Sequence, residues 1–320
     1  MQLVVQWPAL RREGFRFRPY LDLRDPGLRQ ILLLMGPGTL GIAATQINLF
    51  VTTQLATYQG VGAVSWLTYA FRLIYLPVGL FGVSIATAVL PTASRHAAND
   101  DGTAIASTVA RGLGLMLVVN LPATIGLILL SDDIVRLLYE RGRFLPADTT
   151  ATAMVLRYYA VGLIGYSAAR ITAPVFYALH RSRVPVILST VTIALNLVLA
   201  PLLVQQLGVR GLALSTSIGA LFNATALVVL LARHLGPAPF RPLGSTVLRA
   251  SLASVAMALA VTASHRALRV WWPGDQLVTQ AFTVAATIGV GVGALVLAGL
   301  ALRIAEMADA VRAVRRRLGM

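Results

Sequence analysis

Long apolar stretches recur along the whole chain and restrict the folds open to it. Of its 320 residues, 57% are hydrophobic and 12% are charged, about half the charged share of a soluble domain. Runs of about 20 apolar residues can each cross a bilayer as an α-helix, and these runs lack the alternation of membrane barrel strands. The sequence therefore predicts an all-α polytopic membrane protein with about eight transmembrane helices. We place the spans at residues 28–58, 64–92, 104–130, 149–178, 184–205, 211–233, 245–267 and 277–302.

The basic residues are distributed unevenly between the two sides of these spans. All 27 are arginine, and they give the chain a net charge of +15. Connections and tails on one side carry 17 arginines, and those on the other carry six. Because cytoplasmic loops hold the excess of positive charge, we expect the first side, with both termini, to be cytoplasmic. The membrane topology then explains the net positive charge of the chain. We therefore predict no nucleic-acid partner.

Both ends of the chain carry basic segments outside the spans. Residues 1–27 mix arginines with aromatic residues, which suits either an interfacial segment on a lipid surface or a plain juxtamembrane loop. Residues 305–320 hold four arginines and predict a cytoplasmic tail that contacts anionic headgroups.

Groups that carry enzyme chemistry are scarce. The chain has no cysteine and four histidines, which are far apart in sequence, and it contains no HExxH, GxSxG or P-loop pattern. The acid pairs Asp100–Asp101 and Asp132–Asp133 lie between spans and predict helix starts. Residues 131–144 predict a short helix capped by Ser131 that lies on the outer face. We expect a protein that is not an enzyme and holds no metal or other cofactor.

Prolines and glycines interrupt the predicted spans. They include Gly36-Pro37-Gly38, Pro77, Pro122, Pro174 and Pro201. Each proline removes a helix hydrogen bond, and broken helices at membrane depth are typical of transporters. A single kink can equally be architectural.

Uncharged polar residues are embedded in several spans. Gln46, Asn48 and Thr52 lie in the first span, Thr192 and Asn196 in the fifth, and the sixth contains a Ser-Thr-Ser run with Ser217. Single serine or threonine residues usually bond neighbouring helices. So many polar groups on kinked helices favour a shared polar cavity.

Four arginines fall within predicted spans, where a charge is costly. Arg111 and Arg157 are near span ends and are expected to extend to the interface. Arg72 and Arg170 lie deeper, and their spans offer no acidic partner within the membrane. The planar guanidinium suits phosphate, so these two residues predict a site for an anionic substrate. The alternative is that both reach the interface or bind backbone carbonyls at kinks.

Several motifs occur in order along the chain. They are Leu34–Pro37, Gln46–Leu49, Val64–Leu73, Pro77–Thr87, Leu90-Pro91, Ile134–Phe144 and Ala173–Ala178. Together they resemble the MurJ/MviN family of lipid II flippases. The resemblance runs from residue 1 to about 240, with the last two spans in the expected place.

The resemblance implies fourteen helices in two six-helix lobes, with a final pair that forms a groove for a polyprenyl tail. Such proteins move undecaprenyl-pyrophosphate-linked muropeptide, lipid II, across the bacterial inner membrane by alternating access, for peptidoglycan biosynthesis. Residues 28–236 then correspond to the C-terminal lobe, and residues 237–304 to the groove pair. Arg72 matches a family arginine implicated in pyrophosphate binding, and Arg170 matches a basic position of its helix. Gln46, Asn48, Thr52 and Tyr75 are expected to line the same substrate site.

Three departures from the family pattern bear on mechanism. The first lobe is absent, so the chain is expected to be a fragment, a sequence with a misassigned start, or half of a split transporter whose partner chain supplies that lobe. Tyr75 stands where some members have an acid. Thr52 stands where some have a sodium-binding acid, which weighs against coupling to a monovalent cation through Thr192, Asn196 and Ser217. The alternative functions are export of another polyprenyl-linked saccharide and a non-transporting, lipid-binding scaffold.

Overall fold

The computed structural model describes residues 45–271, 274, 276–304 and 307. They all belong to one compact unit, Thr45–Met320. The predicted interfacial segment 1–27, the basic tail 305–320, and the part of the first span that includes Gly36-Pro37-Gly38 lie outside the described residues.

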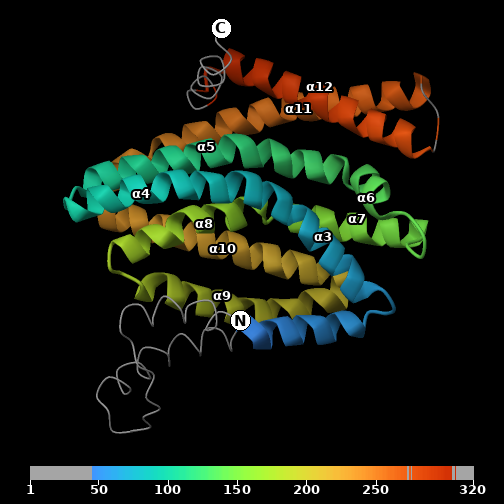
Figure 1. Cartoon of the computed structure of the whole chain (residues 1–320). Helices are drawn as coiled ribbons and strands as arrows, with labels where there is room; N and C mark the ends of the chain where they lie inside the picture. Colours follow the sequence, from blue (N-terminus) through green and yellow to red (C-terminus); the bar gives the residue numbers. More distant parts are fainter. Residues whose placement is uncertain (1–44, 272–273, 275, 305–306, 308–320) are drawn as a thin grey trace, which may run out of the picture. The chain divides into compact units, whose positions relative to one another are not determined.

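Regular structure in the described part of the chain is entirely helical, as Figure 1 shows. Residues 45–57, where the described part of the chain begins, are helical. The elements that follow are α3 (Ala63–Pro77), η1 (Val78–Val83), α4 (Ser84–Ala98), α5 (Gly102–Leu129), α6 (Ser131–Tyr139), α7 (Pro146–Ala160), α8 (Leu163–Ala178), α9 (Arg183–Leu207), α10 (Val209–Leu235), η2 (Ala238–Phe240), α11 (Pro242–Trp271) and α12 (Leu277–Ala301).

Within the described residues, six helical segments are long and apolar enough to cross a membrane, and they match six predicted spans. They are Ala63–Ala98, Gly102–Leu129, Arg183–Leu207, Val209–Leu235, Ala238–Trp271 and Leu277–Ala301. The predicted span 149–178 is instead two shorter helices, α7 and α8, joined by a turn at Val161 and Gly162. The predicted all-α membrane fold is confirmed.

The prolines in the spans differ in their effect on the helix that contains them. Pro122, Pro174 and Pro201 lie inside α5, α8 and α9 without ending them. At Pro77 the helix changes type, because the six residues of η1 that follow form a π-helix between α3 and α4. Proline lacks the N–H needed for the normal i→i−4 bond, and π-helical turns occur mostly as short insertions within α-helices.

Two clusters of buried apolar side chains hold the elements from α3 to α10 together. The first joins α3, α7 and α10 through residues such as Ile74, Leu156 and Leu212. The second joins α4, α5, α8 and α10, with Met116 and Phe176 fully buried. Between α8 and α10 the backbones touch: a Cβ on Gly165 would lie 2.5 Å from the carbonyl carbon of Ala220.

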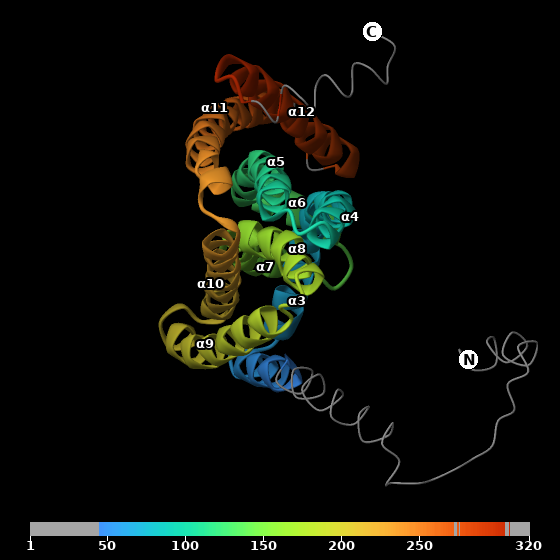
Figure 2. The same cartoon turned by 90° about the vertical axis from the view of Figure 1, so that its left-hand side faces the viewer.

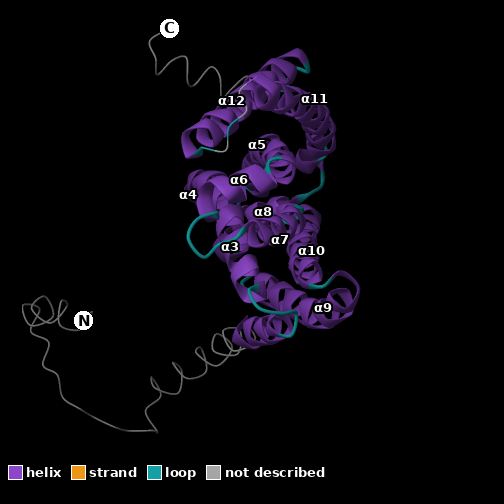
Figure 3. Ribbon diagram, turned by 90° about the vertical axis from the view of Figure 1, so that its right-hand side faces the viewer, coloured by secondary structure: helices purple, strands orange, loops and turns teal. Residues whose placement is uncertain are grey.

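The α11–α12 pair packs on α5, which lies between this pair and α8 in Figures 2 and 3. Val118 of α5 meets Ala250 and Ala253 of α11 in a small buried cluster. Leu130 meets Val261 in a second cluster nearer the end of α5. The pair is thus attached to the other helices along the length of α5.

The predicted helix starts are partly confirmed. Asp101 caps α5, because its Oδ1 accepts a 2.9 Å hydrogen bond from the backbone N–H of Ala104. The short helix α6 forms as predicted, but Ser131 does not cap it. Its hydroxyl donates to the carbonyl oxygen of Ile128 at 3.1 Å, because α6 follows α5 after Leu130 alone and Ser131 is already helical.

Candidate functional site

A cavity of about 380 Å³ lies among the 45–57 helix, α8, α9 and α10. Its lining includes Asn48 from the first of these helices, Arg170 from α8, and Thr192 and Asn196 from α9. These four were predicted as site residues from separate spans, and the structure brings them together. We call this space the α8–α10 cavity.

Two asparagines join the walls of the α8–α10 cavity. The Nδ2 group of Asn196 donates to Oδ1 of Asn48 at 2.9 Å, across 148 positions of sequence. Asn196 is only 4% exposed, so this bond is made away from bulk solvent. Thr192 is bound within its own helix, because its hydroxyl donates to the carbonyl oxygen of Leu188 at 2.7 Å.

Arg170 gives the cavity its charge. The side chain is exposed, and none of the described lining residues is acidic. Arg170 forms no ion pair with any residue that the structure describes. Its guanidinium is therefore available to an anion from outside the chain.

Arg72 lies elsewhere, on the exposed side of α3, and does not line this cavity. Its guanidinium carbon is 5.9 Å from the ring centre of Tyr69, within cation–π range. Tyr69 in turn packs on Tyr139 of α6, with ring centres 4.7 Å apart. Burial raises the pKa of the Tyr139 phenol, and the nearby Arg72 charge partly opposes that increase.

The remaining predicted site residues are dispersed. Gln46 is exposed and Thr52 half-buried on the 45–57 helix, and Tyr75 is 44% exposed on α3 beside Phe71. Ser217 has a structural contact instead, because its hydroxyl donates to the carbonyl oxygen of Tyr158 at 2.9 Å. None of these four lines the α8–α10 cavity.

Other residues that line the cavity were not named as site residues from the sequence. Asn223 of α10 and Tyr166 of α8 both line the cavity. The sequence signal for Asn223 is a carboxamide in an apolar helix. Tyr166 gives no such signal, because a tyrosine in an apolar span is most often part of the core.

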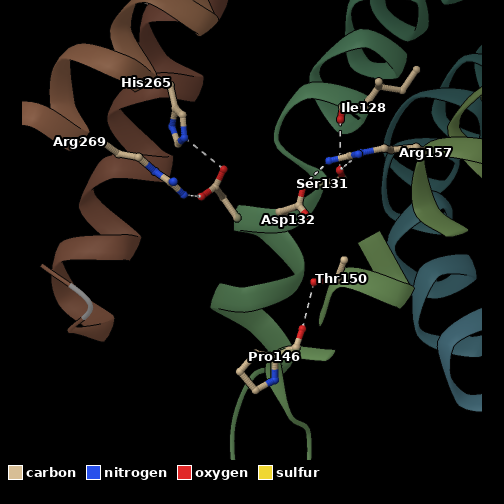
Figure 4. A network of polar contacts seen from close by, with 9 residues as sticks. Ile128, Ser131, Asp132, Pro146, Thr150, Arg157, His265 and Arg269 are labelled. Atoms are coloured by element: carbon tan, nitrogen blue, oxygen red, sulfur yellow. Dashed lines mark hydrogen bonds and ion pairs between the residues drawn. The ribbon is translucent and has the colours of Figure 1, made fainter. Parts of the chain in front are cut away.

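A separate polar network surrounds α6, shown in Figure 4. Arg157 of α7 donates to Ser131 and forms an ion pair with Asp132, so it is paired within the protein, whereas the sequence predicted that it extends to the interface. Asp133 binds His265 and Arg269 of α11. Within the described residues, no group of three His, Cys, Asp or Glu side chains could hold a metal.

The family of the chain follows from its sequence. A family model described as lipid II flippase MurJ matches residues 1–282. The chain belongs to the MurJ family. Curated members named probable lipid II flippase MurJ include those of Vibrio cholerae, 33% identical over 227 residues, and Rhizobium meliloti, 34% identical over 230 residues. These matches cover 71% of this chain but only 43% and 42% of the two relatives.

Solved structures support the same fold. A lipid II flippase MurJ in an inward closed conformation aligns with a TM-score of 0.73 and 24% identity, covering 94% of this chain and 60% of that one. An outward-facing multidrug MATE transporter of the MOP superfamily aligns with a TM-score of 0.53 and 13% identity, covering 86% of this chain and 65% of that one. The chain thus has the MurJ fold and spans less than half the length of the curated MurJ relatives. The resemblance seen in the motifs is confirmed.

Proposed function

We propose that this chain is the part of a lipid II flippase that holds the anionic headgroup while undecaprenyl-pyrophosphate-linked muropeptide crosses the bacterial inner membrane. The observation that carries the proposal is the MurJ family match over residues 1–282. Six long apolar helices agree with a multi-pass membrane transporter, and family members are transporters rather than catalysts.

Arg72 is proposed to hold the pyrophosphate. It is exposed on α3, and no acidic residue that the structure describes forms an ion pair with it. A guanidinium can bind phosphate oxygens through two parallel hydrogen bonds. In this proposal Arg170 adds positive potential, and Gln46, Thr52 and Tyr75 contact the substrate nearby.

The remaining proposals about mechanism are based on the resemblance to the MurJ family. Alternating access requires two lobes that move against each other, so we propose that a second lobe works with this one. The α11–α12 pair is proposed to hold the polyprenyl tail, and both termini are proposed to be cytoplasmic. The proposal includes no coupling to a monovalent cation, because Thr192 and Asn196 line the cavity beside the positive charge of Arg170 and Ser217 is bound to α7.

The test is complementation of flippase-depleted cells with a full-length version. We expect Arg72→Ala to abolish growth and Arg72→Lys to restore it poorly, because lysine lacks the paired donors. Arg111→Ala is the matched control, since Arg111 is an exposed arginine on another span and should be dispensable. Normal growth with Arg72→Ala would remove the proposed role. Substrate binding without translocation by a complete transporter would instead favour the scaffold alternative.

A further inference from the structure

Arg72 lies beside a group of three aromatic rings that come from different parts of the chain. They are Tyr69 of α3, Tyr139 of α6, and Phe144 in the loop that follows α6. The ring centres are 4.7 Å apart for Tyr69 and Tyr139, 5.7 Å apart for Tyr69 and Phe144, and 6.0 Å apart for Tyr139 and Phe144. Each ring therefore contacts the other two, and we call this group the aromatic triad.

Hydrogen bonds from neighbouring residues hold the triad in place. Glu140, which follows the α6 ring in sequence, accepts a 2.6 Å bond from the hydroxyl of Thr149 in α7. Leu145, which follows the loop ring, donates its backbone N–H to Asp148 of α7 at 2.9 Å. The same carboxylate accepts a 2.9 Å bond from Nε1 of Trp66 in α3. These bonds join α6 and its loop to α7, and α7 to α3, so the three rings have fixed relative positions.

The charge of Arg72 is stabilised by this triad and not by an acid. Its guanidinium carbon is 5.9 Å from the centre of the Tyr69 ring, and no acidic residue that the structure describes forms an ion pair with it. Burial raises the pKa of the Tyr139 phenol, and the Arg72 charge opposes that increase. Both tyrosines of the triad therefore interact with the guanidinium.

An aromatic partner leaves an arginine able to bind an anion. The attraction between a cation and the face of a ring is electrostatic and needs no hydrogen bond. A carboxylate partner would instead occupy the paired N–H groups of the guanidinium, which are the groups that a phosphate requires. The ring of Tyr69 can thus restrict the position of the exposed Arg72 side chain without competing for its donors.

We propose that the aromatic triad positions Arg72, with Tyr69 against its guanidinium and with Tyr139 and Phe144 holding the Tyr69 ring in place. The proposal rests on the flippase function proposed above, in which Arg72 holds the pyrophosphate, and it adds positioning residues to that site. Tyr69 acts through Arg72 and needs no contact of its own with the substrate.

The test measures binding of inorganic pyrophosphate to the purified 320-residue chain in nanodiscs of zwitterionic lipid. We expect Arg72→Gln to remove the specific binding, and Tyr69→Leu to weaken it by about tenfold through loss of the cation–π contact. Tyr69→Phe should bind within about twofold of the unaltered chain, because phenylalanine keeps the ring. Tyr158→Leu is the matched control, since Tyr158 is a half-buried tyrosine of α7 that forms no ring contact with the triad.

A double-mutant cycle separates positioning from general packing. Arg72→Lys keeps the charge but loses the planar pair of donors, and it should weaken binding by about tenfold. Adding Tyr69→Leu to Arg72→Lys should then weaken binding by only about twofold more, because no planar group remains to be oriented. If Tyr69 had only a structural role, the two effects would multiply.

A second variant keeps the proposal testable if Tyr69→Leu does not fold. Tyr139→Leu leaves the Tyr69 ring present but removes its support, and it should weaken binding by about threefold at an unchanged melting temperature.

The possible outcomes distinguish this proposal from the role of Arg72 itself. Loss of binding in Arg72→Gln, together with multiplying effects in the cycle or equal weakening by Tyr69→Leu and Tyr158→Leu, would overturn the positioning role alone. Unchanged binding in Arg72→Gln would overturn both the positioning role and the pyrophosphate site.

Discussion

Asp133 of α6 forms an ion pair with Arg269 of α11, 136 positions further along the chain. The same carboxylate lies 3.3 Å from Nε2 of His265, and the Asp133 side chain is only 15% exposed. A single acid in a short helix thus links α11 to the helices around α6. This link supplements the apolar packing of α11 on α5.

Breaking this ion pair should loosen α11 from the rest of the protein. We expect Asp133→Asn to cost about 1 kcal/mol, as for partly exposed ion pairs. It should also speed the labelling of a Val261→Cys reporter, which is buried between α11 and α5. Asp132→Asn is the matched control, because Asp132 pairs with Arg157 of α7 and should not affect Val261. Equal labelling rates in the two variants would show that Asp133 does not hold α11.

Tyr139 should make the protein less stable at high pH. Burial raises the pKa of its phenol above the usual value of about 10, so the folded state holds this proton more tightly than the unfolded state does. The stability from this group is complete below pH of about 10 and is lost as the pH rises through the folded pKa. Arg72→Gln should raise the pKa of Tyr139 further, because the Arg72 charge lowers it. Tyrosinate absorbance titrations, with Tyr139→Phe to identify its signal, measure this change, and an unaltered or lower pKa would contradict it.

Adding a methyl group where α8 meets α10 should be strongly destabilising. A Cβ on Gly165 would lie 2.5 Å from backbone atoms of Ala220, which cannot move aside as a side chain can. We expect Gly165→Ala to cost about 1–3 kcal/mol. Gly126→Ala in α5 meets nothing within 4 Å and should be neutral or stabilise the helix by about 0.5–1 kcal/mol. Thermal unfolding of the two variants tests the contrast, and equal melting temperatures would rule out the close contact.

The core carries a polar side chain whose removal should be tolerated. Asn120 of α5 is fully buried, and neither side-chain polar atom has a hydrogen-bond partner among the described residues. A buried polar group without a hydrogen bond carries a desolvation cost that an apolar side chain does not. We therefore expect Asn120→Leu to keep or raise the melting temperature, and Asn120→Asp to lower it by burying a charge. A large loss of stability in Asn120→Leu would show that the amide is solvated in the fold.

Hydropathy predicted most of the architecture, because crossing a membrane sets the length and composition of a helix. The turn between α7 and α8 was not predicted, since Val161 and Gly162 continue an apolar run and nothing local marks a break. Ser131 was wrongly predicted to cap α6, because α6 begins directly after Leu130 and Ser131 is already its first helical residue. Both errors concern the point where one helix passes into the next.

The sequence favoured a shared polar cavity but did not separate the residues that line it from those that lie elsewhere. Polar residues in apolar spans identified Asn48, Arg170 and Asn196, because burying such groups is costly without a role for them. The sequence could not show that Arg72 lies apart from the cavity that these three residues line. The position of Arg72 relative to the cavity depends on which helices pack together. The side-chain pattern of a single helix does not reveal that packing.

The π-helical turn of η1 changes the neighbours of one long membrane segment. A π-turn holds about one residue more than an α-turn, which rotates the side chains that follow by about 100°. Before it, Leu73 and Ile74 face α7 and its surroundings; after it, Ile85 and Val89 face α5 and α8. The continuous helical segment formed by α3, η1 and α4 thereby contributes to two hydrophobic cores. Deleting a single residue of η1 would turn Ile85 and Val89 away from the core that they fill.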